Sequence, residues 1–229
     1  MIDTSQRPVR MVFTGRAAGN LASHVGADPT ENRARVAESL GLSPEQFVWM
    51  EQLHTNTVSV VDAPQQQPVA ATDAIVTRAD NLALCVLTAD CVPVLLVDPH
   101  AKVIAAAHAG RLGARNGIIR NTVEKMVELG AAPASIQVLL GPAAAGVSYE
   151  VPQHMAEDVE KHLPGSLTRT KRGAPGIDIR AGLVRQLMSL GVTHIEAHPA
   201  DTITDEAFFS YRREGDTGRQ AGIIWLTGE

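Results

Sequence analysis

Three residues that bind metal ions in many proteins, His54, Cys91 and His108, each follow a run of apolar residues typical of a β-strand. Side chains at strand ends and tight turns often face a cleft rather than the core. Two imidazoles and a thiolate suit zinc and leave a fourth tetrahedral position for water, as in a catalytic site. The intervals, 37 residues from His54 to Cys91 and 17 from Cys91 to His108, match no short zinc motif. Spacing alone therefore leaves a zinc site and three ordinary residues as alternatives.

The ordinary interpretations are specific. A free cysteine is often a small buried hydrophobe, and Cys85, which lies inside an apolar run, is expected to be one. A histidine at a strand end can simply cap the strand. The glycines after His108, Gly110 and Gly113, could bring backbone N–H groups close to an anion or could only turn the chain.

Composition limits the classes of protein to consider. The chain has 229 residues, of which 45% are hydrophobic and 20% charged, as in globular proteins of one large domain or two small ones. A net charge of −5 provides no basic field for nucleic acid phosphates. The first ten residues lack the apolar segment of a signal peptide, and the apolar stretch 82–97 is interrupted by Asp90 and Pro93. Two cysteines do not form a disulfide framework. We therefore expect a cytoplasmic protein that binds neither membranes nor nucleic acid.

Helix-capping residues, prolines and apolar stripes predict four helices. The predicted helices cover residues 30–40, about 114–129, 153–163 and 179–190. Between them lie short runs rich in β-branched residues, which predict strands. The predicted strands cover residues 10–13, 47–50, 57–61, 74–77, 82–87, 92–97, 103–107, 136–140, 194–197 and 222–226. Several strands follow one another without a helix between residues 47 and 107, which favours an α+β fold of layered, mixed sheets with helices packed outside.

Short motifs throughout the chain resemble those of one family. The motifs are Gly19-Asn20-Leu21, His24-Val25-Gly26, Asn32-Arg33, Gln52-Leu53-His54, residues 71–77, residues 88–94, His108-Ala109-Gly110, Gly141-Pro142, residues 149–151, residues 209–213 and residues 217–219. In this order the set resembles the YfiH-like family, which was named for a polyphenol oxidase (laccase) domain and is now described as purine nucleoside phosphorylases. The resemblance implies a single αββα-type sandwich domain over residues 1–229.

The resemblance also implies a site and an activity. Its zinc ligands correspond to His54, Cys91 and His108, and its reactions are phosphorolysis of adenosine, inosine, guanosine and S-methyl-5'-thioadenosine, together with deamination of adenosine. The partners would then be a purine nucleoside and phosphate. The substrate-binding candidates are Asn20, Arg33, Gln52, Asp73, Asp90, Arg212 and Arg219. The arginines suit phosphate, whereas Gln52 and the two aspartates suit contacts to the base or to a ligand imidazole. Each arginine could equally form an ordinary surface pair.

The chain departs from the family pattern at three places. Thr55 stands where relatives usually have glycine, and Arg111-Leu112 stands where they usually have Trp-Arg. Asp201-Thr202 replaces a common Cys-Thr pair. The metal ligands are retained, so these departures concern substrate preference.

Two other enzyme classes remain alternatives. In a thiol hydrolase acting on a cell-wall peptide, as the peptidoglycan-editing role of some relatives suggests, Cys91 would be the nucleophile and His108 or His54 its base. A copper oxidase could also use two histidines and a cysteine, although the chain lacks the HxH clusters of multicopper enzymes. A pure binding module would leave the open metal position without a purpose. The sequence indicates neither the oligomeric state nor the preferred nucleoside.

Overall fold

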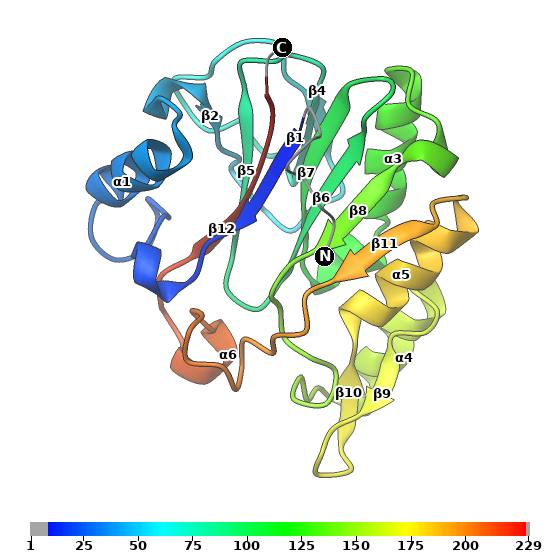
Figure 1. Cartoon of the computed structure of the whole chain (residues 1–229). Helices are drawn as coiled ribbons and strands as arrows, with labels where there is room; N and C mark the ends of the chain where they lie inside the picture. Colours follow the sequence, from blue (N-terminus) through cyan, green and yellow to red (C-terminus); the bar gives the residue numbers. More distant parts are fainter. Residues whose placement is uncertain (1–8, 228–229) are drawn as a thin grey trace.

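Two β-sheets pack face to face between outer layers of helices in the computed structural model, which describes residues 9–227 (Figure 1). The smaller sheet has the strand order β1-β12-β5-β2. Its strands are β1 (Val9–Phe13), β12 (Gln220–Leu226), β5 (Ala83–Thr88) and β2 (Phe47–Val48). Strand β12 pairs antiparallel with both β1 and β5, and β2 pairs parallel with β5.

The larger sheet has the strand order β11-β8-β6-β7-β4-β3. Its strands are β11 (His194–Ala197), β8 (Gln137–Leu140), β6 (Val92–Asp98), β7 (Val103–Ala109), β4 (Ala74–Thr77) and β3 (Val58–Val60). The pairs at the two edges are parallel and the three inner pairs are antiparallel. The mixed sheets and layered α+β class predicted from the sequence are confirmed.

Strand β7 shows how this composition builds two cores with few aromatic residues. All seven of its residues are buried. Side chains alternate between the faces of a strand, and accordingly Ile104 and Ala106 lie between the sheets while Val103, Ala105 and Ala107 face the outer helices. Small alanines at these positions let the layers approach closely, so a run of three alanines is suited to a central strand.

The helices cover the outer faces. Helix α1 (Thr30–Leu40) lies against the smaller sheet, and α3 (Ile118–Glu128), α4 (Gln153–His162) and α5 (Ile179–Ser189) lie on the side of the larger one (Figure 1). The cap of α5 is Asp178, whose carboxylate accepts a hydrogen bond from the backbone N–H of Ala181, as the capping prediction requires.

One predicted helix is divided in the structure, and three short elements were not predicted. The helix expected over about 114–129 is two helices, α2 (Arg111–Arg115) and α3, because Gly117 adopts a left-handed backbone with φ of 87° and interrupts the helix. The hairpin of β9 (Leu167–Arg169) and β10 (Pro175–Ile177) and the short helix α6 (Tyr211–Glu214) were not predicted. Short 3-10 turns lie at Arg16–Ala18, Pro44–Gln46 and Pro133–Ser135. No helix within residues 9–227 is both long and apolar enough to cross a membrane.

Candidate functional site

His54, Cys91 and His108 converge at one end of the two sheets. One nitrogen of each imidazole and the Cys91 sulfur all lie within 4.8 Å of one another, and His54 Nε2 is 3.8 Å from Cys91 Sγ. Cys91 lies in the turn between β5 and β6, and His108 lies near the end of β7, opposite Pro93 of β6. Within the described residues, this is the one group of three or more histidines, cysteines or acidic residues placed to hold a metal ion.

The carboxylate of Asp73 holds two of these three candidate ligands in place. It is fully buried, and its Oδ1 lies 2.8 Å from His108 Nδ1 and accepts a hydrogen bond from the backbone N–H of His54. Its Oδ2 accepts hydrogen bonds from the backbone N–H groups of Leu53 and Thr55 and from the Thr55 hydroxyl. A carboxylate that orients a ligand imidazole in this way is a common feature of metal sites. The Thr55 hydroxyl is thus one of the groups that hold the Asp73 carboxylate in place.

This donor set fits a borderline metal such as zinc. Zinc bonds of about 2.0–2.3 Å place tetrahedral ligand atoms about 3.3–3.6 Å apart. The observed separations, 3.8 Å between His54 and Cys91 and at most 4.8 Å within the group, require only small movements to reach those values. Asp73 binds His108 through Nδ1, so Nε2 of His108 is the nitrogen available as a ligand.

The electrostatics of the site favour a thiolate. Burial raises the pKa of Cys91, but the nearby His108 and the hydrogen bonds from both histidines outweigh it and lower that pKa to about 6. Burial likewise lowers the pKa of His108, but Cys91 and Asp73 outweigh it and raise that pKa to about 9. Burial raises the pKa of Asp73, but hydrogen bonds from His108 and Thr55 outweigh it and lower that pKa to about 2. The thiolate is the form of cysteine that binds metals and attacks electrophiles.

Two backbone features bring the ligands together. His54 and Asp90 have positive φ angles of 61° and 89°, conformations that cost about 1–3 kcal/mol in residues other than glycine. A Cβ atom at Gly110 would lie 2.7 Å from His54 Cδ2 and 3.1 Å from Cys91 Sγ. One at Gly113 would lie 2.8 Å from the carbonyl oxygen of Thr55. Glycine is therefore required at both positions, so that the backbone after His108 can pass close to His54, Cys91 and Thr55.

A cavity of about 570 Å³ opens beside His54, Cys91 and His108, which are among its lining residues. Three arginines, Arg111, Arg212 and Arg219, line it together with Tyr149 and Tyr211. The guanidinium of Arg212 lies over the ring of Tyr149, 4.9 Å from its centre. The cavity thus combines apolar surface with several cations, as a site for an anionic or phosphate-dependent substrate requires.

The substrate-binding candidates divide into two groups. Gln52, Asp90, Arg212 and Arg219 line the cavity. Asn20, Arg33 and Asp73 do not. The side chain of Asn20 instead bonds the backbone of Ala22, Val25 and Arg219, which shapes the loop that it begins.

Arg33 and Gln52 also have partners that the sequence did not indicate. Arg33 lies over the ring of Trp49 at 3.9 Å and donates a hydrogen bond to the Leu21 carbonyl, so it packs against Trp49 rather than lining the cavity. Gln52 lines the cavity but uses its amide to bond both the N–H and the C=O of Leu87.

Several lining residues were not among the sequence candidates, and His24, Thr88 and Tyr211 are three of them. His24 lines the cavity, and its place in a family motif was the available signal. Thr88 and Tyr211 also line it. Thr88 is 1% exposed, and its hydroxyl has no hydrogen-bond partner among the described residues.

The layered fold and this site place the protein in a known class. The chain belongs to the family described as "Multi-copper polyphenol oxidoreductase laccase", which matches residues 5–227. The fold is similar to that of the Bacillus licheniformis hypothetical protein YfiH, with a TM-score of 0.89 and 28% identity over 98% of this chain and 94% of that one. It is also similar to YlmD from Geobacillus stearothermophilus, with a TM-score of 0.84 and 31% identity over 91% and 85% of the two chains.

Curated relatives within this class carry a more specific name. A purine nucleoside phosphorylase of Corynebacterium glutamicum is 58% identical over 242 residues, covering 100% of this chain and 98% of the relative. A purine nucleoside phosphorylase of Mycobacterium tuberculosis is 46% identical over 230 residues, covering 95% and 92%. The resemblance predicted from the motifs is confirmed.

Proposed function

We propose that the protein is a zinc-dependent purine nucleoside phosphorylase. Its substrates would be adenosine, inosine, guanosine and S-methyl-5'-thioadenosine, and it would also deaminate adenosine. The observation that supports this proposal is the convergence of His54, Cys91 and His108 beside a cavity lined by three arginines. The names of the relatives support the phosphorylase activity.

The protein side chains have separate tasks in this proposal. His54, Cys91 and His108 would hold the zinc, which supplies Lewis acidity that lowers the pKa of a water molecule. Asp73 keeps the His108 ring in one orientation through the 2.8 Å contact with Nδ1.

The arginines of the cavity would bind the second substrate. Arg212 and Arg219 would hold phosphate through their guanidinium groups, and Arg111 adds a third cation to the lining. Phosphorolysis transfers the ribosyl group from the purine nitrogen to a phosphate oxygen, so the anion must lie beside the ribose.

The decisive experiment combines metal analysis with a nucleoside assay. We expect one zinc per chain, release of free base from inosine only when phosphate is present, and conversion of adenosine to inosine without phosphate. Chromatography of each nucleoside, incubated with and without phosphate, measures both reactions. Absence of any phosphate-dependent base release from the zinc-loaded protein would contradict the phosphorylase proposal.

Cys91 and Cys85 provide a matched pair for testing the metal site. Both are free thiols, but Cys85 is fully buried in the core beneath α1. We expect Cys91→Ala to lose zinc and activity together, whereas Cys85→Ala loses about 1 kcal/mol of stability and keeps both. Zinc content and urea unfolding measure these effects. An equal loss of zinc from both variants would contradict the assignment.

One arrangement favours a second candidate. Cys91 Sγ lies 3.8 Å from His54 Nε2, and the pKa of Cys91 is lowered to about 6, as in a nucleophilic thiol beside a histidine base. A cysteine hydrolase that acts on a cell-wall peptide would remain active after chelation and lose activity on alkylation of Cys91. The zinc enzyme would lose activity on chelation and recover it with added zinc. A copper oxidase would retain copper rather than zinc in the metal analysis.

A further inference from the structure

The loop of residues 202–208 presents its carbonyl groups to one arginine. Nη1 of Arg213 donates hydrogen bonds to the carbonyls of Thr202, Ile203 and Asp205 at 2.8, 3.2 and 3.2 Å, and Nη2 donates to that of Phe208 at 2.7 Å. Carbonyl groups that point towards one another repel unless a donor lies among them. The loop therefore depends on this guanidinium for its conformation.

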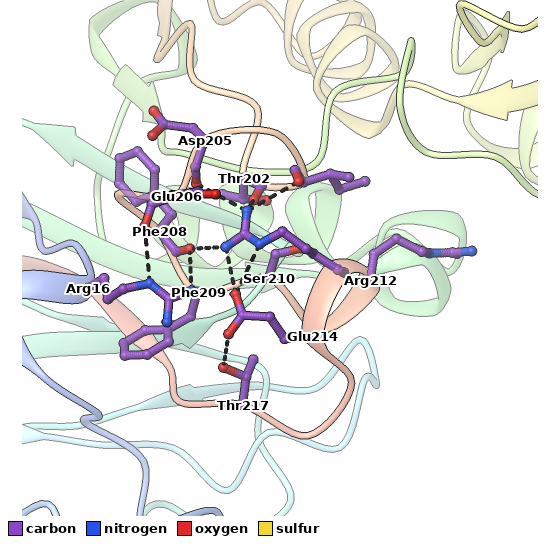
Figure 2. Close-up of polar contacts among 12 residues, drawn as sticks. Arg16, Thr202, Asp205, Glu206, Phe208, Phe209, Ser210, Arg212, Glu214 and Thr217 are labelled. Atoms are coloured by element: carbon purple, nitrogen blue, oxygen red, sulfur yellow. Dashed lines mark hydrogen bonds and ion pairs between the residues drawn. The ribbon is translucent and has the colours of Figure 1, made fainter.

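A second arginine and a carboxylate complete the arrangement. Arg16 donates to the carbonyls of Glu206 and Phe208 and pairs with Glu214, which also accepts hydrogen bonds from Arg213 (Figure 2). Glu214 accepts a further bond from the Thr217 hydroxyl. We name Arg16, Arg213 and Glu214 the guanidinium cluster. It lies outside the cavity lining.

Two hydrogen bonds connect this region with the metal site. The Thr202 hydroxyl donates to Asp90 Oδ1 at 2.6 Å, and the backbone N–H of Arg212 donates to Asp90 Oδ2 at 2.6 Å. Asp90 directly precedes Cys91 and has a positive φ of 89°. The side chain of Arg212 extends away from the guanidinium cluster in Figure 2 and lines the cavity.

The short helix α6 cannot fix its own position. It has four residues, and none of them is buried. So short a helix has almost no intrinsic stability, and without buried side chains packing does not hold it. Its polar contacts to the 202–208 loop and to Asp90, together with the contact of Arg212 with the Tyr149 ring, therefore set where Arg212 lies.

We propose that Arg213 is a positioning residue, which through the guanidinium cluster holds α6 and the 202–208 loop so that Arg212 and Asp90 keep their places in the cavity. This inference rests on the proposed function in that Arg212 binds phosphate. Arg213 itself is not among the residues that line the cavity. Its role requires the forked geometry of a guanidinium, because a lysine ammonium offers fewer donors in a different arrangement.

The test compares Arg213→Lys and Arg213→Gln with Arg169→Gln. Arg169 is a matched control, since it is exposed at the end of β9 and its guanidinium also donates a hydrogen bond to a backbone carbonyl, that of Gly173. Each zinc-loaded variant is unfolded thermally at increasing concentrations of inorganic phosphate. The rise in Tm above the phosphate-free Tm of the same variant gives its affinity for phosphate. We expect both Arg213 variants to bind phosphate about tenfold more weakly, a loss of the size expected for a misplaced bidentate guanidinium, and to show a raised KM for phosphate. Arg169→Gln should behave as wild type. Unchanged phosphate affinity with only a lower starting Tm would overturn the proposal.

Hydrogen exchange provides a measurement that does not depend on phosphate. The amide of Arg212, bonded to Asp90, should exchange faster in Arg213→Gln, with residues of the larger sheet unchanged. If wild type neither binds phosphate nor cleaves nucleosides but this local exchange increases, the proposed function fails and the positioning role stands. Exchange that stays at the wild-type rate in Arg213→Gln would contradict the positioning role.

Discussion

The hydroxyl of Thr88 is buried beside the cavity without a partner among the described residues, an arrangement that costs stability. Thr170, which is also buried with an unpartnered hydroxyl in the described part of the chain, lies outside the cavity lining and serves as its control. We expect Thr88→Val and Thr170→Val each to raise the free energy of unfolding by about 1 kcal/mol, because each removes an unsatisfied polar group. Only Thr88→Val should also raise the KM for nucleosides. Urea unfolding and steady-state kinetics measure the two effects, and a KM change of equal size in both variants would rule out a specific role for Thr88.

At the scale of single residues, the sequence predicted which side chains could bind a metal better than it predicted their neighbours. His54, Cys91 and His108 were identifiable because each follows an apolar run and matches a family motif. The partners of Asn20 and Arg33 could not be identified from the sequence. A polar side chain can bind either the backbone of a loop or a ligand, and only the folded loop shows which. The same holds for Gln52, whose amide bonds Leu87 while it also lines the cavity.

At the scale of elements, the turn from β7 into α2 passes so close to His54 and Cys91 that it admits no side chain at Gly110. We expect Gly110→Ala to displace His54 or Cys91 and to lower zinc affinity by about tenfold or more, a loss comparable to that caused by mutating groups that support metal ligands. Gly130→Ala is the control, since that glycine has a φ of 100° but open space around it. It should lose about 1 kcal/mol of stability and keep zinc. Zinc titration with a competing chelator measures the affinities, and wild-type zinc binding by Gly110→Ala would show that the site adapts to the added methyl group.

The elements themselves followed from sequence patterns where apolar runs were long. Strands β4 and β11 match the predicted ranges 74–77 and 194–197. The strand β9 was missed because it has three residues and is largely exposed, so no alternation of apolar and polar residues marks it. Helix α6 was missed for a similar reason, since four residues without a buried face carry no periodic signal.

At the scale of the whole molecule, Glu214 joins two distant parts of the chain, because its carboxylate pairs with Arg16 as well as with the neighbouring Arg213. Desolvation raises the pKa of Glu214, but hydrogen bonds from Arg16, Thr217 and Arg213 outweigh it and lower that pKa to about 2. A glutamate in the unfolded chain titrates at about pH 4.3. Ionised Glu214 therefore stabilises the folded state above that pH, and this stabilisation is lost as the pH falls from about 4 to about 2. We expect the unfolding free energy of Glu214→Gln to fall less steeply over this range than that of wild type. Urea unfolding at a series of pH values from neutral into this acid range measures the slopes, and identical slopes would contradict the assignment.

The pairing of β1 with β12 also governs how the chain reaches this structure. Val9 pairs with Leu226, so β12 must be in place between β1 and β5 before the smaller sheet is complete. Contacts between residues so far apart in sequence close a long loop and slow folding. The segment that follows the 202–208 loop carries both α6 and β12, and with them Arg212 and Arg219. If the proposed function holds, nucleoside phosphorolysis should therefore not recover during refolding before β12 has paired with β1 and β5.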